Sequence, residues 1–166
     1  MGFVVFLLIV VGIIVLIVVA KKNKRNSAYE ELKNSRVYEL AVKITEELEK
    51  NGFDKFGEPY MEFYNNAAYG VFYGCHPELK YNVHIYFSDN WYTLFEARGF
   101  FGNEKASYGN HVYGIENDNI GMLVTIRAEN EFFEDAPEPI KIAAEVIKSN
   151  GFGSCIEFKK RRLERG

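Results

Sequence analysis

An uncharged apolar stretch near the amino terminus constrains the fold more than any other feature. The eighteen residues from Phe3 to Ala20 are all apolar except Gly12. As a helix this stretch is about 27 Å long, which is close to the thickness of the hydrocarbon core of a bilayer. A buried helix of a soluble domain usually keeps one polar edge, and this stretch has none. The sequence therefore predicts a transmembrane anchor over residues 1–20.

A basic cluster follows the apolar stretch directly. It consists of Lys21, Lys22, Lys24 and Arg25. Positive charge beside a short membrane span stays on the cytoplasmic side. We therefore expect a single-pass protein of the cell membrane with its N-terminus outside and residues 21–166 in the cytoplasm. Residues 21–26 are expected to form a basic linker in contact with the lipid bilayer.

Two other topologies are compatible with the apolar stretch. In one, a cleaved signal peptide ends at the small residues Val18-Val19-Ala20. Signal peptides normally carry positive charge before the apolar part, whereas only Met1 and Gly2 precede it in this sequence. In the other, the anchor is retained and the domain faces outward.

Charge is separated along the chain. The net charge is −3, and the cluster at 21–25 and the tail at 159–166 each carry +4, so residues 26–158 carry −11. An acidic body argues against nucleic acid as its partner and favours a basic protein. We expect one soluble domain at 27–158, followed by a basic C-terminal tail at 159–166.

Two amphipathic helices are predicted in the soluble part. The first starts with a capping box at Ser27–Glu30 and ends at Asn51-Gly52-Phe53, where Gly52 can adopt the left-handed conformation. The second starts with Asp135 as N-cap and ends at Asn150-Gly151-Phe152.

Between and after these helices the apolar period becomes two, which is typical of strands. Short turns between the strands favour antiparallel neighbours. The predicted class is α+β, with an antiparallel sheet of about six strands packed against two helices in two layers. The predicted strands cover residues 60–64, 67–74, 80–88, 91–98, 111–116, 120–128 and a short final segment at 154–159.

The candidate binding surface is aromatic. Tyr60 and Tyr64 flank Glu62, and Tyr86 lies two residues from His84, on what alternation makes the polar face of the sheet. Tyrosine and histidine mixed with acidic residues are typical of protein-binding patches. Phe100 and Phe101, on the long loop 99–110, would extend this patch. The competing interpretation is that tyrosine simply favours strands and that both phenylalanines are part of the core.

Catalytic and metal-binding patterns are weaker. Cys75 near a histidine would form a thiol–imidazole pair, and two strand carboxylates would form an acid–base pair. Cys75 and His76 are adjacent and so point to opposite faces of a strand, and no pair of residues has zinc-finger spacing. We expect no metal and no cofactor. The strand carboxylates are Glu62, Glu96, Glu116 and Glu129.

The main hypothesis is a membrane-anchored protein-binding or regulatory module with an unidentified partner. The order of an apolar helix, an amphipathic helix and an antiparallel sheet also resembles pilin and pseudopilin subunits. This sequence lacks their basic leader and their glutamate near the start of the apolar run. The resemblance implies an exported, membrane-anchored subunit. A membrane-tethered enzyme using Cys75 or a carboxylate pair is the third hypothesis.

Overall fold

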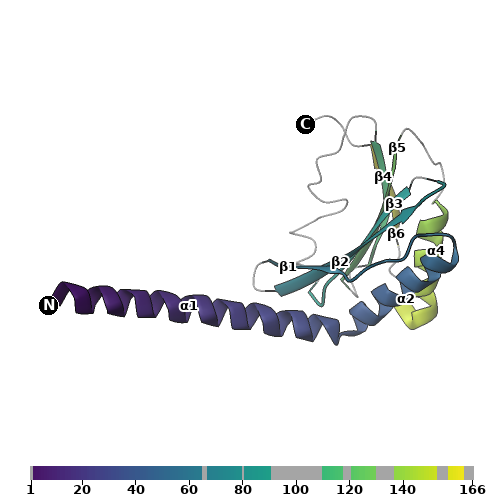
Figure 1. The fold of residues 1–166 in the computed structure, drawn as a ribbon. Coiled ribbons are helices and arrows are strands. Elements are labelled where there is room, and N and C mark those ends of the chain that lie inside the picture. Colours follow the sequence, from purple (N-terminus) through teal and green to yellow (C-terminus); the bar gives the residue numbers. More distant parts are fainter. Residues whose placement is uncertain are drawn as a thin grey trace.

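The computed structural model describes residues 2–64, 67–79, 81–90, 110–117, 121–129, 137–152 and 157–162. It has a long N-terminal helix that projects away from an α+β domain (Figure 1). The helices are α1 (Gly2–Lys33), α2 (Arg36–Lys50) and α4 (Glu138–Ile147), which continues into the π-type turn η1 (Lys148–Phe152). The strands are β1 (Tyr60–Tyr64), β2 (Ala67–His76), β3 (Tyr81–Phe87), β4 (Asn110–Asn117), β5 (Met122–Glu129) and β6 (Glu157–Arg162).

The strands form one antiparallel sheet in the order β1-β2-β3-β5-β4-β6. The hairpin of β4 and β5 is therefore turned so that β5 contacts β3. Both strands of this hairpin lie inside the sheet, because β4 also pairs with β6, and the edge strands are β1 and β6.

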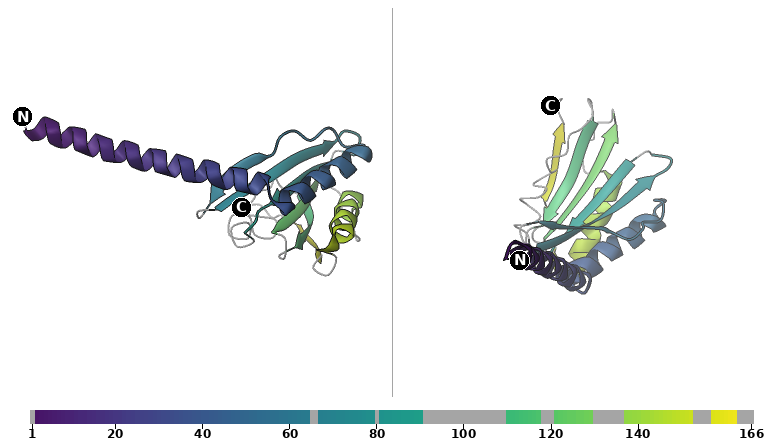
Figure 2. Two further views of the ribbon diagram at one scale, coloured as in Figure 1. Left: turned by 90° about the horizontal axis from the view of Figure 1, so that it is seen from below. Right: turned by 60° about the vertical axis from the view of Figure 1, so that its left-hand side comes forward.

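Helices α2 and α4 cover one face of the sheet (Figure 2). The core lies between them and the strands. Alternation along β3 is strict on this side, because Val83, Ile85 and Phe87 are all fully buried. The helices contribute residues at helical spacing, as an amphipathic face requires. These are Val37, Leu40, Ala41, Ile44 and Leu48 of α2 and Ile140, Ala143 and Ile147 of α4.

The α+β class, the apolar N-terminal helix and the antiparallel sheet packed against helices are confirmed. The strand predicted at 60–64 has the observed bounds, and β2 is two residues longer than predicted. The predicted turn at 65–66 and the predicted strand at 91–98 lie outside the described residues.

The predicted helix start at Ser27 is wrong. Helix α1 continues through residues 21–26 and through Ser27 to Lys33, and the Ser27 hydroxyl donates to Glu31 Oε1 at 3.0 Å inside the helix. The break comes at Asn34 and Ser35. Ser35 has extended backbone angles and is the N-cap of α2, because its Oγ accepts a hydrogen bond from the Tyr38 backbone N–H at 3.2 Å.

The predicted end of α2 is confirmed. Gly52 has a φ of +92°, its N–H donates to the Glu49 carbonyl, and the N–H of Phe53 donates to the Leu48 carbonyl. This pair of bonds is the Schellman pattern, and it turns the Phe53 ring back into the core.

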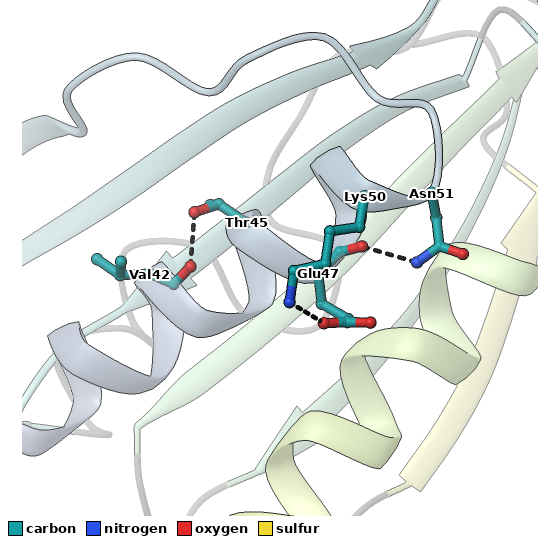
Figure 3. Close-up of polar contacts among 5 residues, drawn as sticks. All are labelled: Val42, Thr45, Glu47, Lys50 and Asn51. Carbon is teal, nitrogen blue, oxygen red and sulfur yellow. Dashed lines mark hydrogen bonds and ion pairs between the residues drawn. The ribbon is translucent and has the colours of Figure 1, made fainter.

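Side chains complete this helix end (Figure 3). Asn51 Nδ2 donates to the Glu47 carbonyl at 2.7 Å, and Lys50 Nζ lies 2.8 Å from Glu47 Oε2. One turn earlier, Thr45 Oγ1 donates to the Val42 carbonyl at 2.7 Å. The hydrogen bond and charge of Glu47 raise the pKa of Lys50 above its usual value.

The second helix ends with similar chemistry. Gly151 has a φ of +91° within η1, as its position in the sequence predicted. Asn150 then links the two helices, because its side-chain Oδ1 accepts from Lys43 Nζ at 2.8 Å and its carbonyl accepts from Arg36 at 3.2 Å. Asp135, the predicted N-cap, lies outside the described residues, and α4 begins at Glu138 after an extended Pro137.

Candidate functional site

The candidate site lies on the face of the sheet opposite α2 and α4. Strand register places its residues in rows across β1, β2 and β3. Glu62 is opposite Tyr69 in one row. In the next rows Val71 lies between Tyr60 and Tyr86, and Tyr73 is opposite His84. Because side chains at alternate positions share a face, these groups lie on one side of the sheet, which we call the tyrosine face.

The acidic group of this face is held by a buried tyrosine. Tyr69 is only 2% exposed, and its hydroxyl donates a hydrogen bond to Glu62 Oε2. Glu62 itself is half-buried on β1. The tyrosine therefore fixes the orientation of the carboxylate at the edge of the sheet.

The histidine is held in the same manner. The Nδ1 atom of His84 lies 3.1 Å from the Tyr86 hydroxyl, and its ring meets the Tyr73 ring edge-on at a centroid distance of 4.8 Å. Tyr86 is 3% exposed. It belongs to the predicted patch, but in the structure it acts by orienting His84 and offers almost no surface of its own.

The exposed part of the tyrosine face is concentrated on β1. Tyr60 is 58% exposed and Tyr64 is 40% exposed, and both flank Glu62 as the sequence indicated. Tyr73 on β2 is also exposed, and sequence reasoning missed it. The signal was available, because the alternation of residues 69, 71 and 73 places Tyr73 on the same face as Tyr69. Phe100 and Phe101 lie outside the described residues.

The proposed thiol–imidazole pair is not brought together in register. Cys75 is opposite Asn82, and His84 is opposite Tyr73, so Cys75 and His84 are diagonal neighbours on one face. Diagonal positions in an antiparallel pair are separated by about 7–8 Å, which is farther than directly opposite positions. The resolved hydrogen bond of His84 Nδ1 is with Tyr86. This geometry gives no support to Cys75 as an activated nucleophile.

The remaining predicted sites have little structural description. Among the carboxylates, Glu96 lies outside the described residues, and Glu116 and Glu129 lie near one end of β4 and at the end of β5, respectively. Within the described part of the chain, no group of three or more His, Cys, Asp or Glu side chains is arranged to hold a metal ion.

The basic cluster lies on α1. Lys21, Lys22, Lys24 and Arg25 are all exposed, and they lie within the helix. Arg25 Nε donates to the Tyr29 hydroxyl at 2.5 Å, and its guanidinium lies 5.2 Å from the centre of that ring. The division between an anchor at 1–20 and a linker at 21–26 stays a prediction, since one helix covers both.

A small cavity of about 140 Å³ lies where α1 meets the sheet. Glu31 and Leu32 of α1 line it together with Ala68, Ser88 and Asp89. Burial raises the pKa of the Asp89 carboxyl, the Ser35 hydroxyl partly offsets this, and the negative charge of Glu31 adds to the increase. The contact between α1 and the domain is therefore acidic as well as apolar.

Comparison with known proteins provides no identity. No family model matches the chain, and neither a curated protein nor a solved structure is similar to it.

Proposed function

We propose that the protein is a single-pass membrane protein whose α1 crosses the cell membrane, with the N-terminus outside. The acidic domain of six strands and two helices is then a cytoplasmic protein-binding or regulatory module. The observation that carries the membrane part is the exposure of α1. It is the one helix among the described residues long and apolar enough to cross a membrane, and none of its most apolar segment is buried in the structure.

The exposed side chains of α1 explain why a membrane is the expected surrounding. Every residue from Phe6 to Ala20 is exposed, including thirteen large apolar residues. Exposed apolar surface of this extent would associate or precipitate in water, and a bilayer removes it from water at about 25 cal/mol per Å². Lys21 to Arg25 then lie at the headgroups, where each positive charge contributes about 1 kcal/mol on an anionic leaflet.

The binding function is supported by the tyrosine face and by net charge. Tyr60 and Tyr64 are large, exposed rings on either side of a half-buried carboxylate. Tyrosine is enriched among the residues that dominate protein–protein binding energy. The −11 charge on residues 26–158 favours a basic partner, because it steers opposite charge toward the domain.

The topology is tested with a reporter fused after Gly166. A cytoplasm-active reporter is expected to work, and an export-dependent reporter is expected to be inactive. The opposite result would contradict the inward orientation and support an exported, pilin-like subunit. Ile13→Arg serves as a second variant, because an arginine near the centre of the span opposes insertion by about 3 kcal/mol. The chain should then shift toward the soluble fraction.

The binding surface is tested by crosslinking in intact membranes. A double variant, Tyr60→Ser with Tyr64→Ser, is compared with Leu79→Ser, which changes an exposed apolar residue outside the tyrosine face. We expect the crosslinked partner to be lost from the double variant and retained by the Leu79 variant. Equal crosslinking in both would contradict the assignment of the tyrosine face.

A further inference from the structure

The polar part of α1 has two chemically different sides. Lys21, Arg25 and Ala28 share one side, because positions three or four residues apart lie on the same face of a helix. Lys22 is two turns before Tyr29, so these two residues also share a side, which adjoins the first. Ala28 and Tyr29 pack against the core of the domain. The positive side of the helix is therefore the side that carries the domain.

The opposite side of the same segment is uncharged next to the apolar stretch. Asn23, Asn26 and Ser27 lie there, three or four residues apart. Glu30 follows one turn later and adds a negative charge. Lys24 lies at the border between the two sides. The charge of α1 in this segment is therefore one-sided.

Tyr29 holds Arg25 on the positive side. The Nε atom of Arg25 donates to the Tyr29 hydroxyl at 2.5 Å, and the guanidinium lies 5.2 Å from the centre of the ring. Tyr29 is half-buried, whereas Arg25, Lys21 and Lys22 are exposed. A guanidinium is a planar donor that suits phosphate oxygens, and a lysine ammonium adds a point charge. These groups suit a phosphate-bearing ligand.

We propose that Lys21, Lys22 and Arg25 bind the headgroup of an anionic phospholipid on the side of α1 that carries the domain. This inference rests on the proposed function, and it names the lipid class that the basic cluster selects and the side on which the lipid binds. From Ala20 to Arg25 the helix rises about 7.5 Å. The cations therefore lie within about one Debye length of the bilayer surface, where each contributes about fivefold to the affinity for anionic lipid.

The acidic domain does not cancel this attraction. Ala28 packs against the core about 12 Å beyond Ala20 along the helix. The potential of an anionic leaflet decays over a Debye length of about 8–10 Å. Most of this potential therefore acts on the basic cluster, and the −11 charge of residues 26–158 lies largely beyond it.

The proposed site adjoins the first residues of β2. Ala28, one turn beyond Arg25, lines the cavity of about 140 Å³ together with Ala67 and Ala68. Strand β2 begins next to α1 (Figure 1). A reactive group on a headgroup that is bound to Lys21 and Arg25 is therefore expected to reach β2.

The acidic domain of a second copy is the alternative occupant of the basic cluster. Its carboxylates would also pair with Lys21 and Lys22. Anionic lipid is favoured because the headgroups lie beside the cluster in every copy, whereas a second copy must first associate and lose translational and rotational freedom.

The test uses the full chain in phosphatidylcholine nanodiscs that contain a small fraction of a photoreactive lipid. Two such lipids are compared, and both carry a diazirine on the headgroup. One has an anionic phosphoglycerol headgroup, and the other has a zwitterionic phosphocholine headgroup. After irradiation, mass spectrometry identifies the labelled peptides of α1 and β2. The association constant is obtained from the amount of label at increasing lipid fraction.

Two variants locate the site. Lys21→Gln with Lys22→Gln removes two charges and should lower the association constant of the anionic lipid about 25-fold. The matched control adds Asn23→Lys and Asn26→Lys to this double variant, which restores the net charge on the opposite side of the helix. The control should regain labelling of α1 by the anionic lipid but not labelling of β2. Unchanged hydrogen exchange in β3 shows that the variants are folded.

Four outcomes would overturn the inference. Equal labelling of β2 by the two lipids would show no selectivity for charge, and full labelling of β2 in the matched control would show no selectivity for the side. Displacement of the label by soluble glycerophosphoglycerol would assign the cluster to a free phosphate ester. A dimer that forms in neutral nanodiscs and is lost from the glutamine variant would assign the cluster to a second copy.

The same experiment separates this inference from the proposed function. Equal labelling of α1 by both lipids would contradict only the lipid selectivity, whereas no labelling of α1 by either lipid would contradict the membrane span itself. A nanodisc exposes both leaflets, so the result does not depend on orientation. The reporter fusion and the tyrosine crosslinking still test the orientation and the binding surface.

Discussion

The two halves of α1 have similar apolar side chains in opposite surroundings. Leu16, in the first half, is 71% exposed, and Leu32, in the second, is 1% exposed. Both belong to one unbroken helix. In the first half the apolar residues surround the helix, whereas in the second half Ala28, Tyr29 and Leu32 form one side that packs against the domain. A helix that is apolar all round needs an apolar solvent, and a one-sided helix needs a protein surface.

This difference shows how the apolar stretch and the domain are joined. Positions 21, 25, 28 and 32 share one face of a helix, because they are three or four residues apart. Lys21 and Arg25 therefore point to the same side as the residues that pack on the sheet. The basic cluster lies between the apolar stretch and the domain, and the continuous helix keeps both at a fixed separation.

The largest expected effect separates the two halves directly. Leu32→Ala should reduce the free energy of unfolding of the domain by about 2–5 kcal/mol, because it removes a buried side chain next to an existing cavity. Leu16→Ala should leave domain stability unchanged. Urea unfolding of the full chain in detergent micelles, followed by intrinsic fluorescence, measures both. An equal loss of unfolding free energy from both substitutions would contradict the assignment of only the second half of α1 to the domain.

A smaller effect distinguishes two serines of the packed half. Ser35→Ala removes the N-cap of α2 and should reduce stability by about 1 kcal/mol. Ser27→Ala removes only an exposed bond to Glu31 within the helix and should change stability by less than about 0.5 kcal/mol. The same urea titration measures the stability of both variants. A larger loss of stability from Ser27→Ala than from Ser35→Ala would support the helix start at Ser27 that the sequence indicated.

The smallest effect concerns pH at the contact between α1 and the sheet. The pKa of Asp89 is raised above 3.8 in the folded state, so the folded chain binds more protons than the unfolded chain over the interval between these pKa values. The contribution of Asp89 to stability is therefore complete below pH 3.8 and is lost as pH rises through the raised folded pKa. Asp89→Asn should lack this decline, which is measured by unfolding from about pH 3 to pH 6.

The exposed Asp54 provides the control for this measurement. Asp54→Asn makes the same change of side chain at an exposed position, and its pH dependence is the reference for Asp89→Asn. If the two variants show the same pH dependence of stability, then Asp89 does not contribute to the pH dependence of the contact.

Local chemistry explains which parts of the fold were predictable. The end of α2 was predictable because glycine adopts a positive φ without strain and Phe53 is apolar, and these are properties of adjacent residues. The alternation of β3 was predictable because a strand has a period of two. The membrane-spanning segment, the orientation and the binding role were inferred from composition, and they stay proposals.

Other parts depended on contacts between distant residues. Serine is a favoured N-cap residue, so Ser27 and Ser35 were both candidates for the helix start. Helix α1 continues past Ser27 because Leu32, near its end, is buried against the sheet. The order β3-β5-β4 depends on which strands pair across the sheet, and this pairing joins residues that are distant in the sequence. Tyr86 looked like a surface residue, yet it is 3% exposed, and Val71, which is opposite it in register, is also buried.

The sequence by itself determined an apolar helix of bilayer length, an acidic body between basic ends, and the alternation that builds an α+β domain. These properties follow from hydrophobicity, charge and backbone period, each of which is read within a few residues. Only the tertiary structure decided that one helix runs from the apolar stretch to Lys33, and that Tyr69 and Tyr86 hold Glu62 and His84 in position. Those outcomes depend on which surfaces meet, because burial free energy is gained only when separate segments pack together.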